Sequence, residues 1–259
     1  MKTIKIGING FGRIGRQAFK VALEHPEAEV VGINDLTSTA VLGHLLKYDS
    51  VYGRYQRKVE WDETNIIVDG RSYPVSAEKD PASLPWGKLG VDVVIESTGR
   101  FTDSEKSSAH IKAGARKVVI SAPAKDEGVT PTIVLGVNAD KYTGQNIISC
   151  ASCTTNCIVP VLAVMQETFG VEKALMSTIH SYTAEQNLVD GPPPGGKSND
   201  LRRARAAALN IIPTTTGAAI SATQAIPSLK GKFDGVSFRV PTPVGSLSDF
   251  VILTKKKRN

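Results

Sequence analysis

Three cysteines, at positions 150, 153 and 157, stand where a helix is predicted to begin. Cys153, the middle one, falls in the run Ala-Ser-Cys-Thr-Thr-Asn-Cys and would lie in the first turn of that helix. The positive end of a helix dipole lowers the pKa of a thiol in that place and increases its thiolate fraction. A thiolate can add to an aldehyde carbonyl, and the resulting hemithioacetal can release a hydride and leave a thioester. The segment therefore predicts a cysteine nucleophile for aldehyde oxidation.

This chemistry requires a general base. His180 is the leading candidate, because histidine exchanges protons near neutral pH and the chain holds only four of them. The sequence alone does not place His180 beside Cys153.

The three cysteines also fit two other kinds of site. Cys150 and Cys153 have the spacing of a redox pair, and together with Cys157 they could bind a metal ion. A metal site is disfavoured because one short run without a second ligand cluster leaves the coordination incomplete. Cys157 follows Cys153 by one helical turn and is most simply a small buried residue.

A glycine motif near the N-terminus predicts a dinucleotide site. Gly10, Gly12 and Gly15 form a GxGxxG pattern that follows a predicted strand and opens a predicted helix, where free N–H groups can bind a pyrophosphate. The next predicted strand ends at Asp35, whose carboxylate can bind a ribose 2′-hydroxyl and would repel a 2′-phosphate. NAD is therefore favoured over NADP. The alternatives are a plain glycine turn and a helix-capping role for Asp35.

Strands and helices alternate over the first half of the chain. Apolar, β-branched runs predict strands at Thr3–Asn9, Glu29–Asn34, Val91–Ser97, Lys117–Ser121, Thr132–Val137 and Asn146–Ser149. Helical spacing predicts helices at Arg13–Glu24, Thr39–Lys47 and Ser104–Ala113. Asp69-Gly70 predicts a hairpin turn within an antiparallel excursion. This pattern indicates a Rossmann-type, doubly wound α/β domain with a parallel sheet.

A different pattern follows Cys153. A helix at Thr154–Phe169 precedes a long strand at Lys173–Thr183, and two late strands are expected at Gly235–Pro241 and Ser246–Thr254. These elements indicate an α+β catalytic domain with a mostly antiparallel sheet. The expected domains are residues 1–152, which would bind NAD, and residues 153–259, which would carry the catalytic groups.

Composition narrows the classes of function. The 259 residues carry a formal net charge of +6, but Lys255, Lys256, Lys257 and Arg258 supply four of the positive charges, so nucleic-acid binding is not expected. No apolar run is long enough to cross a bilayer, which predicts a soluble protein without a membrane partner. An odd number of clustered cysteines and no export signal indicate a reducing cytoplasm.

Seven segments together resemble the glyceraldehyde-3-phosphate dehydrogenase family, over the whole length of the chain and in the family's order. They are INGFGRIGR (Ile8–Arg16), ESTGRFT (Glu96–Thr102), ASCTTNC (Ala151–Cys157), HSYT (His180–Thr183), LRRARAA (Leu201–Ala207), IIPTTTGAA (Ile211–Ala219) and RVPTP (Arg239–Pro243). The resemblance implies phosphorylating oxidation of glyceraldehyde 3-phosphate with NAD and inorganic phosphate, in a homotetramer of glycolysis or gluconeogenesis.

The resemblance also implies a role for individual residues. Cys153 would be the nucleophile, and His180 the base that also stabilises the oxyanion. The NAD side would include Arg13, Ile14, Asp35, Thr98 and Ser121, beside the glycines at 10, 12 and 15. Inorganic phosphate would bind at Ser152, Thr154, Thr216 and Gly217. The substrate's phosphate would bind at Thr183, Arg203 and Arg239, with Arg239 serving both phosphate pockets.

Physical reasoning supports the two phosphate pockets. Arginine forks and hydroxyl groups suit two bound phosphates. Along the strand that holds Arg239, the apolar residues Val236, Phe238 and Val240 are expected to face a core, so Arg239 would face a ligand on the other side.

Some positions differ from the family's pattern. Family members continue beyond Asn259, so the chain is expected to lack its C-terminal end, and its second domain to be incomplete there. It would then expose a sheet edge, be weakly active or inactive, and be prone to aggregate. Glu185 stands where many relatives have Asp, and no role is assigned to it. Cys150 replaces a common Asn and would make the site easier to oxidise. The proline-rich segment Gly191–Asn199 looks longer than usual and leaves the tetramer's details open.

Two other functions remain possible from the sequence. An erythrose-4-phosphate dehydrogenase shares most motifs but hydrolyses its thioester, and the complete set of inorganic-phosphate residues argues against it. A non-catalytic nucleotide-binding interaction protein would not need Cys153, His180 and both arginines.

Overall fold

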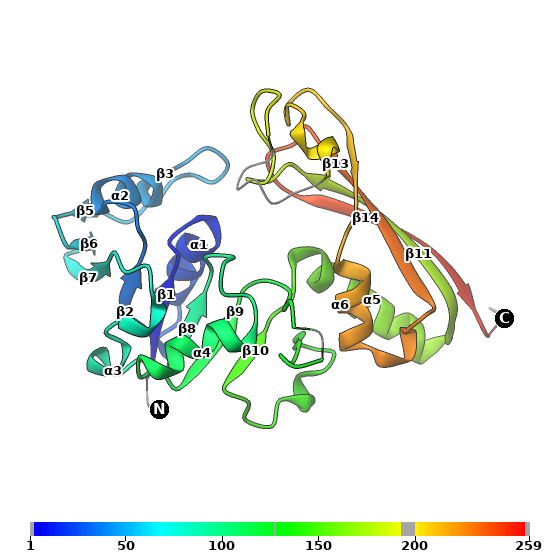
Figure 1. The fold of residues 1–259 in the computed structure, drawn as a ribbon, viewed down its shortest axis with the longest axis horizontal. Coiled ribbons are helices and arrows are strands. Elements are labelled where there is room, and N and C mark those ends of the chain that lie inside the picture. The colour runs from blue at the N-terminus through cyan, green and yellow to red at the C-terminus, as the bar shows by residue number, and fades with distance from the viewer. Residues whose placement is uncertain (1–2, 127, 193–199, 257–259) are drawn as a thin grey trace. The chain divides into compact units, whose positions relative to one another are not determined.

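The computed structural model describes residues 3–126, 128–192 and 200–256 and divides into two compact units (Figure 1). The first unit holds the described residues up to Ile133 together with Asp140–Ala151. The second holds Val134–Ala139 and the described residues from Ser152 onward. The part of the expected segment Gly191–Asn199 that follows position 192, and Lys257 and Arg258 of the basic end, lie outside the described residues.

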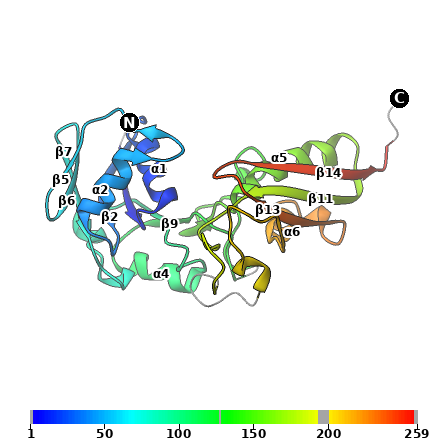
Figure 2. The same ribbon diagram turned by 90° about the horizontal axis from the view of Figure 1, so that it is seen from above.

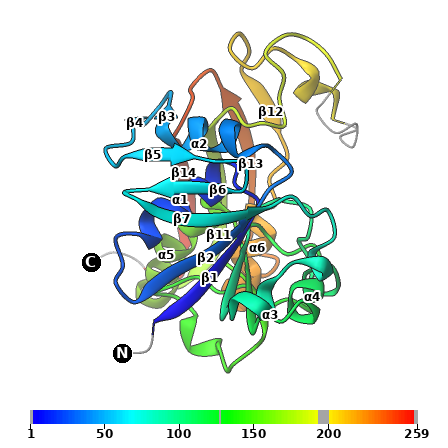
Figure 3. The ribbon, with the colours of Figure 1, turned by 90° about the vertical axis from the view of Figure 1, so that its left-hand side faces the viewer.

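The first unit is built on an eight-stranded sheet with the order β10-β9-β8-β1-β2-β7-β6-β5. Its strands are β1 (Ile4–Asn9), β2 (Ala28–Asn34), β5 (Val59–Trp61), β6 (Asn65–Val68), β7 (Arg71–Ser76), β8 (Val93–Glu96), β9 (Lys117–Ile120) and β10 (Ile147–Ser149). Six of them, from β10 to β7, pair in parallel, and β6 and β5 continue the sheet antiparallel (Figure 3). The predicted parallel α/β sheet is confirmed.

Helices cover the first sheet on both faces. They are α1 (Arg13–Ala22), α2 (Thr39–Lys47), α3 (Trp86–Leu89) and α4 (Ser104–Lys112). One apolar core joins the sheet to α1 and α2 through residues such as Phe19 and Leu46. The other lies around Trp86 of α3 and includes Val94 and Val118. Cores on both faces explain why the central strands are apolar without alternation.

The excursion after α2 contains short elements. A small ladder joins β3 (Tyr48–Asp49) to β4 (Gly53–Arg54), and a 3-10 turn follows β7 at Pro81–Ser83. A second 3-10 turn, at Ala139–Lys141, lies outside the excursion, between β9 and β10. Asp69 and Gly70 have φ values of 50° and 82°, so both are left-handed as a tight hairpin turn requires. The predicted hairpin is confirmed between β6 and β7. Its second strand, β7, joins the main sheet in parallel with β2, which the sequence did not indicate.

The second unit holds a four-stranded sheet with the order β12-β13-β11-β14. Its elements are α5 (Cys153–Thr168), β11 (Val171–Ser181), β12 (Ile212–Thr214), α6 (Ala218–Ala225), β13 (Phe233–Val240) and β14 (Ser246–Thr254), with 3-10 turns at Leu201–Ala204 and Pro227–Leu229. The two late strands do not pair with each other: β11 lies between them, parallel to β13 and antiparallel to β14 (Figure 2). The sheet is mostly antiparallel, as predicted.

The two faces of the second sheet differ sharply. Ala174, Met176 and Phe233 point to one face and are buried, and α5 and α6 pack there side by side. The opposite face carries exposed apolar side chains. Leu175 and Val251, which are register partners on β11 and β14, are 62% and 70% exposed. An exposed apolar sheet face of this kind is a surface that a partner can bury.

The expected environment of β13 is therefore reversed. Val236 is 50% exposed, and Phe238 and Val240 are only partly buried, so these residues do not face a core among the described residues. Alternation does place Arg239 on the other side, but that side is the helix-covered one. The alternation of side chains between the two faces of β13 was predictable, whereas which of these faces is buried was not.

The expected strand Thr132–Val137 is also wrong. Thr132 forms an isolated bridge to Ser149 rather than part of a ladder, and the backbone N–H of Val134 donates to the side chain of Asn138. Apolar composition alone did not reveal that these backbone groups bond locally. The proposed domain boundary near residue 152 stays a prediction. Within the described residues, no helix combines the length and hydropathy that crossing a bilayer requires.

Candidate active site

The first turn of α5 holds Cys153. Ser152 precedes the helix, and its hydroxyl oxygen accepts a hydrogen bond of 3.1 Å from the backbone N–H of Thr155. This cap fixes where the helix begins and makes Cys153 its first residue. The side chain of Thr154 is buried, and its hydroxyl lies 4.0 Å from the Cys153 sulfur. The sequence therefore places the thiol at the positive end of a helix, as expected.

His180, on β11, faces this thiol. Its Nε2 lies 3.5 Å from the Cys153 sulfur. Its Nδ1 donates a hydrogen bond of 2.7 Å to the carbonyl oxygen of Ser181. Because a carbonyl oxygen only accepts, Nδ1 carries a proton and Nε2 is left to exchange a proton with sulfur. The structure thus brings together the two residues that sequence reasoning had to leave apart.

The pair alters the acidity of both groups. The hydrogen bond from His180 lowers the pKa of Cys153 to about 7, against the opposing effect of burial. The same hydrogen bond raises the pKa of His180, against burial and the nearby Arg239 charge. The lowered pKa of the thiol and the raised pKa of the imidazole favour a thiolate–imidazolium pair near neutral pH. Two causes therefore favour the Cys153 thiolate: the start of the helix, on which the prediction from sequence was based, and the hydrogen bond from His180.

Two arginines lie near the pair. Arg239 of β13 is the register partner of His180, and its Nη1 donates to the Thr183 hydroxyl at 2.6 Å. Arg203 contacts Glu185 in an ion pair, and Arg239 lies 3.8 Å from the same carboxylate. Burial lowers the pKa of Arg239. All three residues to which a substrate-phosphate role was assigned therefore share one neighbourhood.

This neighbourhood contains unsatisfied donors. The Nε atoms of Arg203 and Arg239 and the Nε2 atom of Gln186 are buried without a hydrogen-bond partner in the described structure. Gln186 belongs to the same turn, because its Oε1 accepts from the backbone N–H of Thr183. Buried donors without acceptors are costly, so an anion that reached them would stabilise this neighbourhood. The Asp200 carboxylate lies 3.8 Å from Arg203 Nε, beyond hydrogen-bonding distance.

Sequence reasoning gave Glu185 no role, yet it lies against both arginines. No motif could have shown this, because the contact joins a loop after β11 to Arg203 and to Arg239 of β13. Its carboxylate contacts the two guanidinium groups that were predicted to bind the substrate's phosphate. Glu185 therefore competes with any anion that binds the two guanidinium groups.

Thr216 and Gly217 stand at the start of α6. The Thr216 hydroxyl oxygen accepts a hydrogen bond of 3.1 Å from the backbone N–H of Ala218, and an added Cβ on Gly217 would meet nothing within 4 Å. Gly217 is the N-cap residue of α6, and Ser152 is the N-cap residue of α5. The four residues predicted for inorganic phosphate therefore lie at two helix N-termini.

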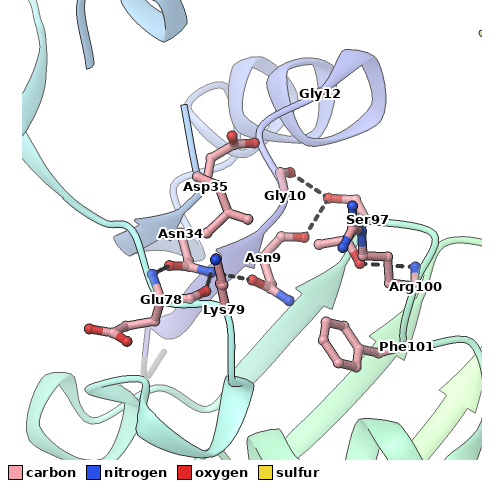
Figure 4. Close-up of a pocket in the computed structure, with 12 residues that line it drawn as sticks. Asn9, Gly10, Gly12, Asn34, Asp35, Glu78, Lys79, Ser97, Arg100 and Phe101 are labelled. Atoms are coloured by element: carbon pink, nitrogen blue, oxygen red, sulfur yellow. Dashed lines mark hydrogen bonds between the residues drawn. The ribbon is translucent and has the colours of Figure 1, made fainter. Parts of the chain in front are cut away.

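The first unit has a pocket at the carboxyl ends of β1, β2 and β8 (Figure 4). Its walls include Gly10, Gly12, Asp35 and Thr98, four of the predicted cofactor residues. Gly10 has a φ of 91°, and a Cβ on Gly15 would lie only 2.0 Å from the Gly10 carbonyl oxygen. These glycines are required for the tight turn between β1 and α1, and the open space beside Gly12 fits a phosphate.

Asp35 stabilises this turn. One carboxylate oxygen accepts from the backbone N–H of Phe11 at 2.8 Å, and the other accepts from that of Thr37. The residue that precedes α2 is Ser38, so the capping alternative for Asp35 is wrong. The carboxylate lines the pocket at the end of β2, where it can accept from a ribose hydroxyl.

Four predicted cofactor residues do not line the pocket: Gly15, which lies in the first turn of α1, and Arg13, Ile14 and Ser121. Arg13 forms an ion pair of 3.2 Å with Asp49, and Ile14 is 56% exposed on α1. Ser121 donates its hydroxyl to the carbonyl oxygen of Glu96 and so joins β9 to β8. Any contact that they make with a cofactor lies outside the pocket walls.

The other cysteines do not fit the alternatives. Cys150 is partly buried, and burial raises its pKa, which opposes reactivity. Cys157 is exposed, so the prediction that it is a buried residue is wrong. The described residues contain no group of three or more His, Cys, Asp or Glu that could hold a metal ion.

Comparisons with known proteins agree with the geometry. Residues 4–104 match the model of the "Glyceraldehyde 3-phosphate dehydrogenase, NAD binding domain", and residues 152–259 match that of the family's "C-terminal domain". The glyceraldehyde-3-phosphate dehydrogenase of Geobacillus stearothermophilus is 53% identical over 98% of this chain and 75% of its own length. The relatives from Streptomyces coelicolor and Bacillus subtilis are 54% and 53% identical, over 96% of this chain and 73% of their own lengths.

The lowered thiol pKa predicts a pH profile. We expect iodoacetamide to alkylate Cys153 with a midpoint near pH 7, because only the thiolate reacts and its fraction rises as the pH passes the pKa. In the His180→Asn variant the midpoint moves upward, since the hydrogen bond and the positive charge are lost. Mass spectrometry of each cysteine, with exposed Cys157 as the internal reference, gives the rates. An identical midpoint in both proteins would contradict the assigned cause.

Proposed function

The chain belongs to the glyceraldehyde-3-phosphate dehydrogenase family, and on that premise we propose which of its residues perform each part of the family's reaction. The protein is an NAD-dependent phosphorylating oxidoreductase of glycolysis. It converts glyceraldehyde 3-phosphate, NAD and inorganic phosphate to 1,3-bisphosphoglycerate and NADH. The contact of 3.5 Å between the Cys153 sulfur and His180 Nε2 is the observation on which the assignment of roles depends.

Cys153 is the nucleophile and His180 the acid–base group. The thiolate attacks the aldehyde carbon and forms a carbon–sulfur bond, while protonated Nε2 donates to the oxygen that becomes negative. When the carbonyl of the thioester re-forms, Nε2 takes this proton back as a base and a hydride leaves the carbon. The hydrogen bond from Nδ1 to Ser181 holds the ring in one orientation throughout.

The first unit would hold the cofactor. NAD, when bound, supplies the acceptor of the hydride. The turn at Gly10 and Gly15 would bind its pyrophosphate, Asp35 its adenosine ribose, and Thr98 would line the remaining wall. The residues present fit the group, because the glycine turn leaves the space and supplies the N–H donors that a pyrophosphate requires.

Two groups of residues would bind the phosphates. Arg203, Arg239 and Thr183 would hold the phosphate of the substrate, supported by the unsatisfied Nε donors of both arginines. Inorganic phosphate would bind at the helix starts with Ser152, Thr154, Thr216 and Gly217. Its oxygen attacks the thioester carbon, and the Cys153 thiolate leaves. This step returns the sulfur to its starting state.

The apolar face of the second sheet supports a homo-oligomer. Leu175, Val236 and Val251 are exposed on adjacent strands, and burying them against another copy would remove apolar area from water. We propose that the protein assembles as a homotetramer through this face among others. The three free cysteines suit a reducing compartment, and the cytoplasm is the proposed location.

The thioester mechanism predicts a strict need for phosphate. With glyceraldehyde 3-phosphate and NAD but no phosphate, we expect NADH formation to stop at about one equivalent per active site, because the thioester accumulates. Added inorganic phosphate should restore continuous turnover. Rapid-mixing absorbance of NADH measures both phases. Continuous turnover without phosphate would instead indicate hydrolysis, as in an erythrose-4-phosphate dehydrogenase.

Glu185 should weaken the binding of phosphorylated substrate. In the Glu185→Gln variant we expect the KM for glyceraldehyde 3-phosphate to fall about two- to fivefold with kcat little changed, because an exposed ion pair is worth about 0.5–1 kcal/mol. Glu185→Asp keeps the charge and serves as the matched control. A higher KM in the glutamine variant would show that Glu185 orders the arginines rather than competing with the ligand.

The oligomer proposal predicts a response to charge on the apolar face. We expect Leu175→Asp to reduce the assembled fraction, because burial of a carboxylate in an apolar interface is costly. Sedimentation velocity measures the effect at several protein concentrations. Glu63→Lys, which reverses an exposed charge in the first unit, is the control. An unchanged distribution in Leu175→Asp would exclude this face from the interface.

A further inference from the structure

Five polar side chains form a buried chain through the first unit. They come from the carboxyl ends of three neighbouring strands and from the helices α3 and α4. In order along the chain of hydrogen bonds they are Asn34, Asn9, Glu96, His110 and Trp86. Glu96 is 1% exposed and His110 is fully buried. The first two members, Asn34 and Asn9, line the cofactor pocket (Figure 4).

The inner end of this chain fixes the state of His110. Trp86 Nε1 lies 3.0 Å from His110 Nδ1, and an indole N–H can only donate. Nδ1 must therefore present a lone pair, so the proton of the neutral ring is on Nε2. His110 Nε2 lies 3.0 Å from Glu96 Oε2 and donates to it. The contact has the geometry of an ion pair, but the indole leaves the imidazole neutral.

Glu96 accepts hydrogen bonds from two residues that line the pocket, Asn9 and Thr98. Its Oε2 also accepts from Asn9 Nδ2 at 2.6 Å, and Asn9 Nδ2 lies 3.4 Å from His110 Nε2 because both donors converge on this oxygen. Its Oε1 accepts from the backbone N–H of Thr98 at 2.8 Å and from the Thr98 hydroxyl. Every contact of the carboxylate is with a donor, and Thr98 is a wall of the pocket.

The outer end of the chain sets the orientation of two amides. Asn9 Oδ1 accepts from Asn34 Nδ2 at 2.7 Å, so its Nδ2 must face Glu96. Asn34 in turn donates to the carbonyl oxygen of Glu78 and accepts from its backbone N–H. Donor and acceptor are thus assigned at each link between Trp86 and the far wall of the pocket. Reversal of one link would place two donors against each other.

We propose that Glu96 is a positioning residue of the cofactor site, acting through Asn9 and Thr98, and that it depends on the His110 tautomer that Trp86 and the Glu96 carboxylate both select. The proposal rests on the proposed role of this pocket in NAD binding. Glu96 itself is too deeply buried to touch a ligand. It holds the walls in their binding geometry before the cofactor arrives, so less order is lost on binding.

The character of the network favours this role over stability alone. A buried carboxylate contributes little net stability compared with an apolar residue of the same shape. A fully satisfied polar network does, however, define one arrangement of its members. That arrangement determines where Asn9 and Thr98 stand at the mouth of the pocket. The expected consequence of its loss is therefore weaker cofactor binding.

The Glu96→Gln variant tests the proposal. Its amide NH₂ would meet either the donors of Asn9 and His110 or those of Thr98, so one wall must move. We expect the Kd for NAD, measured by calorimetry, to rise about tenfold, since an unsatisfied buried donor has a cost of that order. The alkylation rate of Cys153, in the other unit, should not change. Urea unfolding confirms that the variant is folded under the conditions of the titration.

A second substitution separates positioning from loss of structure. In Glu96→Gln/Trp86→Phe the indole N–H is gone, so His110 can carry its proton on Nδ1 and accept from glutamine at Nε2. We expect the double variant to bind NAD about threefold more tightly than Glu96→Gln, although it removes more of the core. Trp86→Phe alone is the matched control: the Glu96 carboxylate only accepts, so it still selects the His110 tautomer with its proton on Nε2, and the Kd should remain within about twofold of wild type.

Nuclear magnetic resonance of wild-type protein labelled with ¹⁵N histidine adds a test that requires no variant. The His110 ring should show a protonated Nε2 and an unprotonated Nδ1. The opposite tautomer, an unchanged Kd in folded Glu96→Gln, or additive effects of the two substitutions would each overturn the proposal. Failure of the wild-type protein to bind NAD would instead overturn the proposed function of the pocket.

Discussion

The proton shared by Cys153 and His180 controls the chemistry of the second unit. The sulfur stands on the first residue of α5, the imidazole on β11, and their separation of 3.5 Å depends on the packing of that helix against the sheet. Each group shifts the pKa of the other toward the charged form. Because Nδ1 is tied to Ser181, the ring cannot turn away. The thiol and the imidazole therefore act as a pair, and neither would have its shifted pKa without the other.

The charges around the pair also affect the pKa of His180. The charge of Arg239 lowers the pKa of His180, whereas the charge of Cys153 raises it, so the two neighbours act in opposition. A phosphate bound to Arg239 would offset the guanidinium charge and favour the imidazolium further. Glu185 already does part of this in the free protein. An anion bound at Arg239 would therefore change the pKa of His180, since the charge of this guanidinium group acts on the imidazole.

Local signals were sufficient for much of the fold and of the site. The apolar runs predicted the central strands of the first sheet, and the pair Asp69 and Gly70 predicted the hairpin. Local signals failed where contacts between residues far apart in the sequence determine the structure. The stretch Thr132–Val137 is apolar yet makes no strand, because its N–H groups bond within its own turn and to Ser149. Neither the approach of His180 to Cys153 nor the buried side of β13 is encoded in a short run of sequence.

The two ligand sites also differ in how their hydrogen bonds are arranged. In the second unit, buried donors of Arg203, Arg239 and Gln186 are left without acceptors, so binding of an anion satisfies groups that are costly in the free protein. In the first unit, the donors around Glu96 are all matched, so the pocket wall has its geometry before any ligand binds. The first arrangement would favour the binding of an anionic group such as the phosphate of the substrate. The second would let a large cofactor with many contacts lose less order on binding.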